Sequence, residues 1–238
     1  MRNRVLCLRS LSTLFIFVSM LSLGCETDNP VQDESSIPET NLLPIAVGRS
    51  WVFTVYDLDT TSSQKVESSV HREASYVEGV TDFNGKTAYR MVDSTYTPAG
   101  TLGRIDTSYL ISENDDFARW DEEFETWIYM FKKSEGLNTD YVLSEFQKIL
   151  EGVPVTITFK GTNYPKEEVT APIGTVQAYK VKVVGTATFG GIQSGISEQY
   201  LYFAAGYGPV RMYTPVQVDF GSGVKNTGEE SLLVSKNF

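Results

Sequence analysis

Apolar and polar residues alternate along most of the chain, which is the pattern of half-buried β-strands. In one clear case, Val155, Ile157 and Phe159 alternate with two threonines and a lysine. Turn sequences such as Asn84-Gly85, which tolerates the positive φ angles of a tight hairpin, separate these runs. The spacing predicts an antiparallel meander of about eleven or twelve strands.

The runs that we expect to form strands are rich in β-branched and aromatic residues and are bounded by turn residues. They are residues 50–57, 66–76, 86–96, 105–111, 117–121, 125–132, 154–160, 168–171, 175–189, 192–204, 209–218 and 228–238. Residues 125–132 are apolar on both faces, so we expect that strand to be covered on both sides.

Residues 139–151 break this alternation. Val142, Phe146, Ile149 and Leu150 follow a spacing of three and four residues, which would place them on one face of a helix. Polar residues that can cap a helix precede the run, and Gly152 can end it. The pattern therefore predicts one amphipathic helix packed on a mainly β, antiparallel sheet.

The first 24 residues differ in composition from the rest. Three arginines precede the uncharged run 11–23, which is the layout of an export signal and is shorter than the ~20 apolar residues that cross a bilayer. Gly24-Cys25 follows and resembles the cleavage site of bacterial lipoprotein signal peptides, although Ser22 stands where that family usually has leucine. The resemblance implies that Cys25 is acylated and becomes the N-terminus.

These features divide the chain into three expected parts. Residues 1–24 are the predicted lipoprotein signal peptide, residues 25–41 the lipidated Cys25 with an acidic flexible tether, and residues 42–238 a single β-rich domain. Residues 26–40 contain five acids and no base, so they cannot bury enough apolar surface to order themselves.

The charge balance limits the classes of partner. Removing three arginines with the signal from 20 basic residues leaves 17 against 30 acidic ones, a net charge of −13. A strongly acidic surface repels nucleic acid and anionic headgroups alike. We therefore expect no nucleic-acid partner, and we expect the lipid anchor to hold the protein on its membrane.

Aromatic residues are frequent on the predicted strands, where they fit two interpretations. They can fill a closed core, or they can line a concave sheet that holds a lipid or another apolar ligand. The candidate lining residues are Trp51, Phe53, Trp127, Tyr129, Phe131, Tyr179 and Tyr202.

Three fragments carry short motifs in a fixed order. Residues 43–51 contain P-x-x-V-G-x-x-W, residues 169–181 contain V-x-x-P-x-G-T, and residues 202–210 contain Y-x-A-x-G-x-G followed by an atypical Pro209. Together they resemble a family of uncharacterised bacterial envelope lipoproteins. The resemblance implies a curved antiparallel sheet or open half-barrel, similar to periplasmic lipoprotein carriers, and it implies no known activity.

Patterns for catalysis and metal binding are missing from the sequence. His71 is the single histidine, so a Ser-His-Asp triad would have to use it, and no Gly-x-Ser-x-Gly motif is present. Zinc would need more His or Cys ligands, and the acidic runs 113–116 and 121–125 lack the calcium-loop pattern, although calcium binding there stays open. We predict no catalytic residue, no metal site and no cofactor.

We interpret the chain as a lipid-anchored lipoprotein of the bacterial cell envelope, on the outer rather than the inner membrane. It is expected to bind an apolar ligand or an envelope partner without catalysis. The first alternative is a purely structural or interaction role with a filled core. The second is a carboxylate-dependent hydrolase, because the separation of two carboxylates is set by the fold rather than by the sequence.

The anchor is tested by Cys25→Ser, which removes the thiol that would carry the diacylglycerol and palmitate-type acyl chains. We expect the variant to leave the membrane fraction, because acyl chains contribute ~0.8 kcal/mol per buried methylene. The measurement is fractionation of cell envelopes by immunoblot. Unchanged membrane association of the variant would contradict the anchor.

Overall fold

The computed structural model describes residues 37, 40–150, 152–218 and 225–238. The predicted signal peptide, Cys25 and all of the predicted tether except Ile37, Thr40 and Asn41 lie outside the described residues. Ile37 and Leu42 are buried, at 4% and 0% exposure, in the same core cluster. The folded part therefore includes at least one side chain that precedes residue 42.

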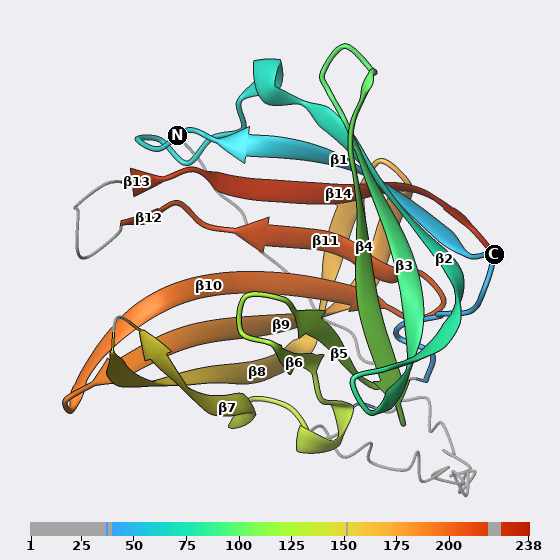
Figure 1. Cartoon of the computed structure of the whole chain (residues 1–238). Helices are drawn as coiled ribbons and strands as arrows, with labels where there is room; N and C mark the ends of the chain where they lie inside the picture. Colours follow the sequence, from blue (N-terminus) through green and yellow to red (C-terminus); the bar gives the residue numbers. More distant parts are fainter. Residues whose placement is uncertain (1–36, 38–39, 151, 219–224) are drawn as a thin grey trace, which may run out of the picture. The chain divides into compact units, whose positions relative to one another are not determined.

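The described residues form a twelve-stranded antiparallel sheet and a small two-stranded one (Figure 1). The strands are β1 (Ser50–Leu58), β2 (His71–Phe83), β3 (Lys86–Tyr96), β4 (Leu102–Glu113), β5 (Asp116–Asp121), β6 (Thr126–Phe131), β7 (Asp140–Leu150), β8 (Val153–Ala171), β9 (Gly174–Phe189), β10 (Ile192–Ala204), β11 (Gly208–Thr214), β12 (Gln217–Val218), β13 (Lys225–Asn226) and β14 (Gly228–Asn237). Two 3₁₀ turns, η1 (Glu67–Ser69) and η2 (Lys133–Glu135), complete the elements.

The sheet consists of two meanders joined by the C-terminal strand. Its strand order is β6-β5-β4-β3-β2-β1-β14-β11-β10-β9-β8-β7, so β14 lies between the first and the second meander (Figure 1). The hairpin between β2 and β3 turns at Asn84 and Gly85, whose φ angles of 45° and 76° suit a two-residue loop. The predicted antiparallel meander is confirmed, and two predicted strands, 86–96 and 192–204, match β3 and β10 at both ends.

The sheet is more closed than the predicted open half-barrel. Its edge strands β6 and β7 are consecutive in sequence, and no backbone ladder pairs them among the described strands. Side chains bridge these two strands instead. Ser144 Oγ donates to the Trp127 carbonyl at 3.1 Å and accepts from the Tyr129 N–H at 3.3 Å. Lys132 Nζ donates to the Val142 carbonyl at 2.8 Å. These contacts form a seam that nearly closes the sheet on itself.

Asn163 of β8 holds the loop that joins the two edge strands. Its side chain is fully buried, and its amide nitrogen donates to the Lys132 carbonyl at 2.9 Å and to the Gly136 carbonyl at 3.0 Å. Its amide oxygen accepts a hydrogen bond of 2.6 Å from the Tyr141 hydroxyl. One buried amide thus satisfies groups from the loop and from β7 together, as buried polar groups require.

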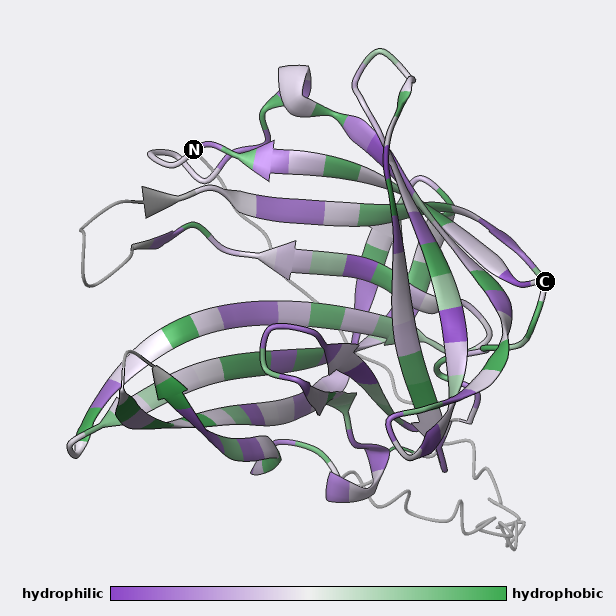
Figure 2. Ribbon diagram, in the orientation of Figure 1, coloured by the Kyte–Doolittle hydropathy of each residue, from purple (hydrophilic) through white to green (hydrophobic). Residues whose placement is uncertain are grey.

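Apolar and polar residues alternate along the strands as bands of opposite hydropathy (Figure 2). One core cluster joins β5 and β6 to the second meander, since the rings of Phe117 and Phe203 lie 4.7 Å apart in an edge-to-face arrangement. A second cluster is built around Trp51, Phe53 and Leu233. Among the described residues, no helix is long and apolar enough to cross a membrane.

The amphipathic helix predicted over 139–151 is wrong, because residues 140–150 form β7. A β-bulge between Val142 and Ser144 interrupts the two-residue alternation, and exposed apolar residues of the strand complete a spacing that resembles one helical face. Tyr141 and Leu143 are buried, whereas Val142 and Ile149 of the expected helical face are 47% and 72% exposed.

Tyr141→Phe tests the role of the Asn163 network. The change leaves the buried amide oxygen of Asn163 without its donor, so we expect unfolding in urea to require about 1–3 kcal/mol less free energy. Tyr76→Phe is the matched control, because Tyr76 is 45% exposed, and should change stability by less than about 0.5 kcal/mol. Equal effects of the two changes would contradict the network.

The same tyrosine predicts a dependence of stability on pH. Burial raises the pKa of Tyr141 well above its usual value, since the phenolate is poorly solvated inside the domain. The neutral phenol therefore stabilises the fold fully below the unfolded-state pKa of about 10, and this contribution is lost as the pH rises above that value. Denaturation midpoints measured from about pH 8 to about pH 11 should fall more steeply for the unmodified chain than for Tyr141→Phe. Parallel curves would contradict this assignment.

Candidate functional site

Two adjoining hollows lie on the inner side of the curled sheet. The smaller has a volume of about 320 Å³ and is lined mainly by β1 to β4. The larger has a volume of about 950 Å³ and extends from β4, β5 and β6 to β8, β9 and β10. Both are lined by Asp106, Ser108, Arg119 and Met130. These shared walls make the two hollows one candidate site that reaches both meanders.

Much of the wall is apolar and adaptable. Met91, Met130 and Met212 line the smaller hollow together with Leu110, and the larger one adds Ile128, Ile157, Phe159, Val183 and Leu201. Methionine side chains are unbranched and polarisable, so they fit apolar ligands of irregular shape. Each of the two volumes lies in the range of small-molecule sites.

A polar group interrupts this wall on β3. Asp93 is 27% exposed, and each of its carboxylate oxygens accepts a 2.6 Å hydrogen bond, one from Ser75 Oγ and one from Ser108 Oγ. A guanidinium nitrogen of Arg119 lies 3.8 Å from the same carboxylate. These residues were not among the predicted site residues. An acid two positions from Met91 in an alternating strand, and hence on the same face, is the signal that points to Asp93.

The structure places three of the seven predicted lining residues at the hollows. Trp51 and Phe53 line the smaller one, and Tyr129 lines the larger one. Phe131 is fully buried instead, and its ring centre lies 5.0 Å from that of Phe117 in the core.

The other three predicted residues lie elsewhere. Trp127 packs with Trp120 and Phe83 in a separate aromatic cluster, at ring distances of 5.5 Å and 6.2 Å. Tyr202 is 4% exposed and has the Arg211 guanidinium 5.0 Å from its ring centre. Tyr179 is 3% exposed and lines a further hollow of 280 Å³ beside Tyr207. Sequence alternation gave the strand positions of these residues but not the curvature that separates them.

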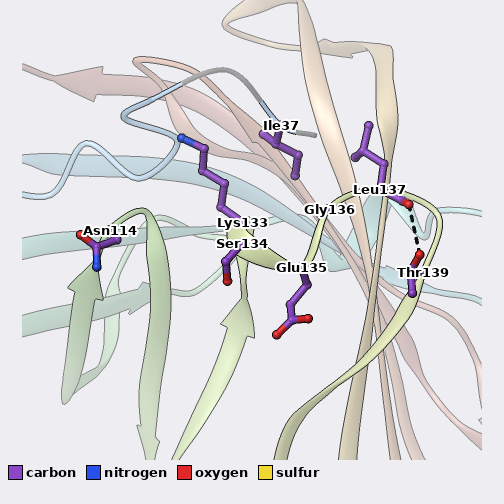
Figure 3. Close-up of a pocket in the computed structure, with 8 residues that line it drawn as sticks. All are labelled: Ile37, Asn114, Lys133, Ser134, Glu135, Gly136, Leu137 and Thr139. Carbon is purple, nitrogen blue, oxygen red and sulfur yellow. Dashed lines mark hydrogen bonds between the residues drawn. The ribbon is translucent and has the colours of Figure 1, made fainter. Parts of the chain in front are cut away.

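A third hollow, of about 560 Å³, lies beside the loop between β6 and β7 (Figure 3). Its residues come mostly from η2 and the following loop, and Ile37 and Leu137 supply its apolar part. The Lys133 ammonium group is held at 3.1 Å by the Asp115 carboxylate. This hollow lacks the methionine and aromatic wall of the inner site, so we do not assign it a ligand.

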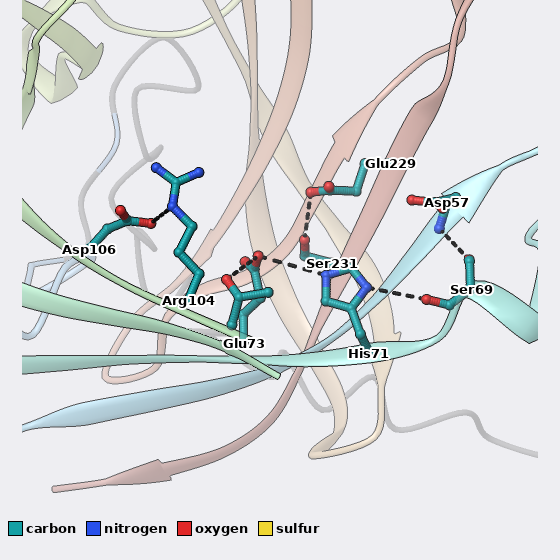
Figure 4. A network of polar contacts seen from close by, with 9 residues as sticks. Asp57, Ser69, His71, Glu73, Arg104, Asp106, Glu229 and Ser231 are labelled. Carbon is teal, nitrogen blue, oxygen red and sulfur yellow. Dashed lines mark hydrogen bonds and ion pairs between the residues drawn. The ribbon is translucent and has the colours of Figure 1, made fainter. Parts of the chain in front are cut away.

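His71 takes part in a surface network at the start of β2 (Figure 4). Its Nδ1 lies 3.2 Å from the Ser69 carbonyl, and its Nε2 lies 3.8 Å from the Glu73 carboxylate. Ser69 Oγ is occupied with the backbone, because it donates to the Val66 carbonyl and accepts from the Asp57 N–H. The recorded contacts of the histidine ring are thus with a carbonyl and a carboxylate rather than with a serine hydroxyl.

Three carboxylates of the acidic runs accept hydrogen bonds from backbone N–H groups. Asp115 accepts from the Asn41 N–H at 3.0 Å, and Asp116 accepts from the Lys133 N–H at 2.7 Å. Asp121 accepts from the Phe124 N–H at 2.8 Å. Within the described ranges, no group of three or more His, Cys, Asp or Glu side chains is placed to hold a metal ion.

The fold has counterparts among solved structures. No family model matches the chain, and no curated protein matches its sequence. It is similar to a Parabacteroides distasonis protein provisionally classed as a lipoprotein, with 17% identity, a TM-score of 0.52 and coverage of 83% of this chain and 99% of that one. A Bacteroides fragilis protein provisionally classed as exported, with a YmcC-like fold, gives 12% identity, a TM-score of 0.48 and coverage of 81% and 97%. The first likeness shows a shared fold.

The three sequence motifs meet in one place in that fold. Trp51 of the first motif donates through its indole nitrogen to the Tyr207 carbonyl of the third motif, at 2.7 Å. Gly208 has a φ of 82°, and a Cβ at that position would lie 2.9 Å from the indole nitrogen. Val169 and Ala178 of the second motif belong to the same core cluster. The motifs therefore have a packing role.

Proposed function

We propose that the chain is a lipid-anchored lipoprotein of the bacterial cell envelope, on the outer rather than the inner membrane, whose folded part binds an apolar or amphipathic ligand. The observation that carries the proposal is the pair of adjoining hollows, of 320 and 950 Å³, with three methionines in their wall. The proposed role needs no catalytic step.

Two features of the site support binding over a purely structural role. Each of the two adjoining hollows has the size of a small-molecule site. The apolar wall also extends over both meanders, so a ligand inside would contact strands from each of them. Burial of ligand surface there supplies a driving force of about 25 cal/mol per Å².

Met130→Trp tests this site, because Met130 lines both hollows and an indole would fill part of the shared space. We expect the neutral dye N-phenyl-1-naphthylamine to bind the unmodified mature chain and to bind the variant about tenfold more weakly or not at all, read by its fluorescence.

Val142→Trp is the matched control, because Val142 is 47% exposed on β7 and lines neither hollow. It should leave dye binding unchanged. Absence of dye binding in the unmodified chain, or equal binding by both variants, would contradict the proposed site and favour a docking role for a protein partner.

A further inference from the structure

The guanidinium group of Arg119 has more N–H donors than its contacts with the described residues use. Arg119 belongs to β5, where its cross-strand neighbours Leu110 and Ile128 line the smaller and the larger hollow respectively. Its side chain is 54% exposed, and its nearest acid, Asp93, is 3.8 Å away. A guanidinium group carries five N–H donors in a planar fork. Arg119 lines the part that the two hollows share, and among the described residues its guanidinium group has no protein acceptor at hydrogen-bond distance.

Asp93 leaves this arginine only loosely paired. The Ser75 and Ser108 hydroxyl groups each donate to one oxygen of the carboxylate at 2.6 Å, and these bonds fix its position. A 3.8 Å approach lies within reach of charge attraction but beyond a hydrogen bond. The carboxylate therefore keeps the guanidinium near the wall while its donors stay open to a ligand.

The second arginine at the larger hollow is engaged differently. Arg104 is 75% exposed, and its Nε lies 2.6 Å from the Asp106 carboxylate, which neutralises it. Arg119 is thus the arginine of this lining whose nearest acid lies beyond hydrogen-bond distance. Asp121, Glu122 and Glu123 also line the larger hollow, so the local charge opposes a ligand with several negative charges.

We propose that the hollows bind an amphiphile with a single negatively charged headgroup, and that Arg119 is the residue that binds this headgroup. The inference rests on the proposed function, because the apolar part of the ligand would lie along the methionine wall. Arginine matches planar carboxylates in a two-bond fork, which gives geometric specificity as well as energy. A long-chain fatty acid has this chemistry, and a lysophospholipid with one phosphodiester charge offers it from another source.

The experiment compares hexadecanoate with hexadecanol, which has the same chain and no charge. Both displace N-phenyl-1-naphthylamine from the mature chain, residues 25–238, carrying Cys25→Ser so that no acyl chain is attached. Arg119→Gln should weaken hexadecanoate binding about tenfold and leave hexadecanol binding unchanged. Arg119→Lys should give an intermediate loss, because it keeps the charge and loses the fork.

Two further variants make the result specific. Asp93→Asn should tighten hexadecanoate binding several-fold without affecting hexadecanol, because it removes a negative charge beside the headgroup while an amide can still bond both serines. Arg90→Gln is the matched control: Arg90 is an arginine of similar exposure, 45%, paired with Glu78 and lining neither hollow. It should change neither affinity.

The outcomes separate the inference from the proposed function. If Arg119→Gln leaves hexadecanoate binding unchanged, or weakens hexadecanol equally, the headgroup role of Arg119 is overturned while the apolar site stands. If neither probe binds the unmodified chain, the inference and the proposed function both fail. A third ligand distinguishes the two sources of the headgroup. If hexadecyl lysophosphatidylglycerol binds at least tenfold more tightly than hexadecanoate, and Arg119→Gln weakens both to the same extent, Arg119 remains the residue that binds the headgroup. The preferred headgroup is then the phosphodiester.

Discussion

The closure of the sheet depends on side chains rather than on a backbone ladder. Ser144 of β7 bonds to the backbone of β6, and Lys132, which follows β6, bonds to the backbone of β7. Asn163 holds the connecting loop. Without these contacts, two strand edges would remain open, which is a hazard for aggregation. With them, the edges meet while the inner faces of the two meanders stay far enough apart to leave a hollow.

This arrangement explains how one sheet supplies both a core and a binding site. Aromatic residues of β5, β6 and β10 close one region, where Phe117, Phe131 and Phe203 are in contact. The hollow lies beside Met91 of β3, Met130 of β6 and Met212 of β11, which line its wall. The polar group around Asp93 lies in that space, fixed by serines of β2 and β4. The fold thus places a close-packed aromatic core in one region and the candidate binding site in another.

Much of the fold follows from local pattern, and the exceptions have physical causes. Alternation located most strands, and Asn84-Gly85 located a hairpin, because both signals are local. The exposed apolar residues Val142 and Ile149 of β7 imitated one face of a helix. Two predicted strands are one long strand, β8, which continues through a bulge between Tyr164 and Lys166. The lining of the site could be predicted only in part from the sequence. Alternation placed Trp51 and Trp127 on strands, but the curvature of the sheet, which separates these two residues, arises from long-range strand pairing. Arg119 and Asp93 became visible as a pair only in three dimensions.

Native mass spectrometry of the mature chain shows whether the hollow holds a ligand. The chain would be exported through a bacterial envelope as Cys25→Ser and purified without detergent. We expect a stoichiometric extra mass that lipid extraction removes and whose fragments contain an acyl chain with one acidic group. A bare mass that takes up neither added fatty acid nor phospholipid would contradict this expectation.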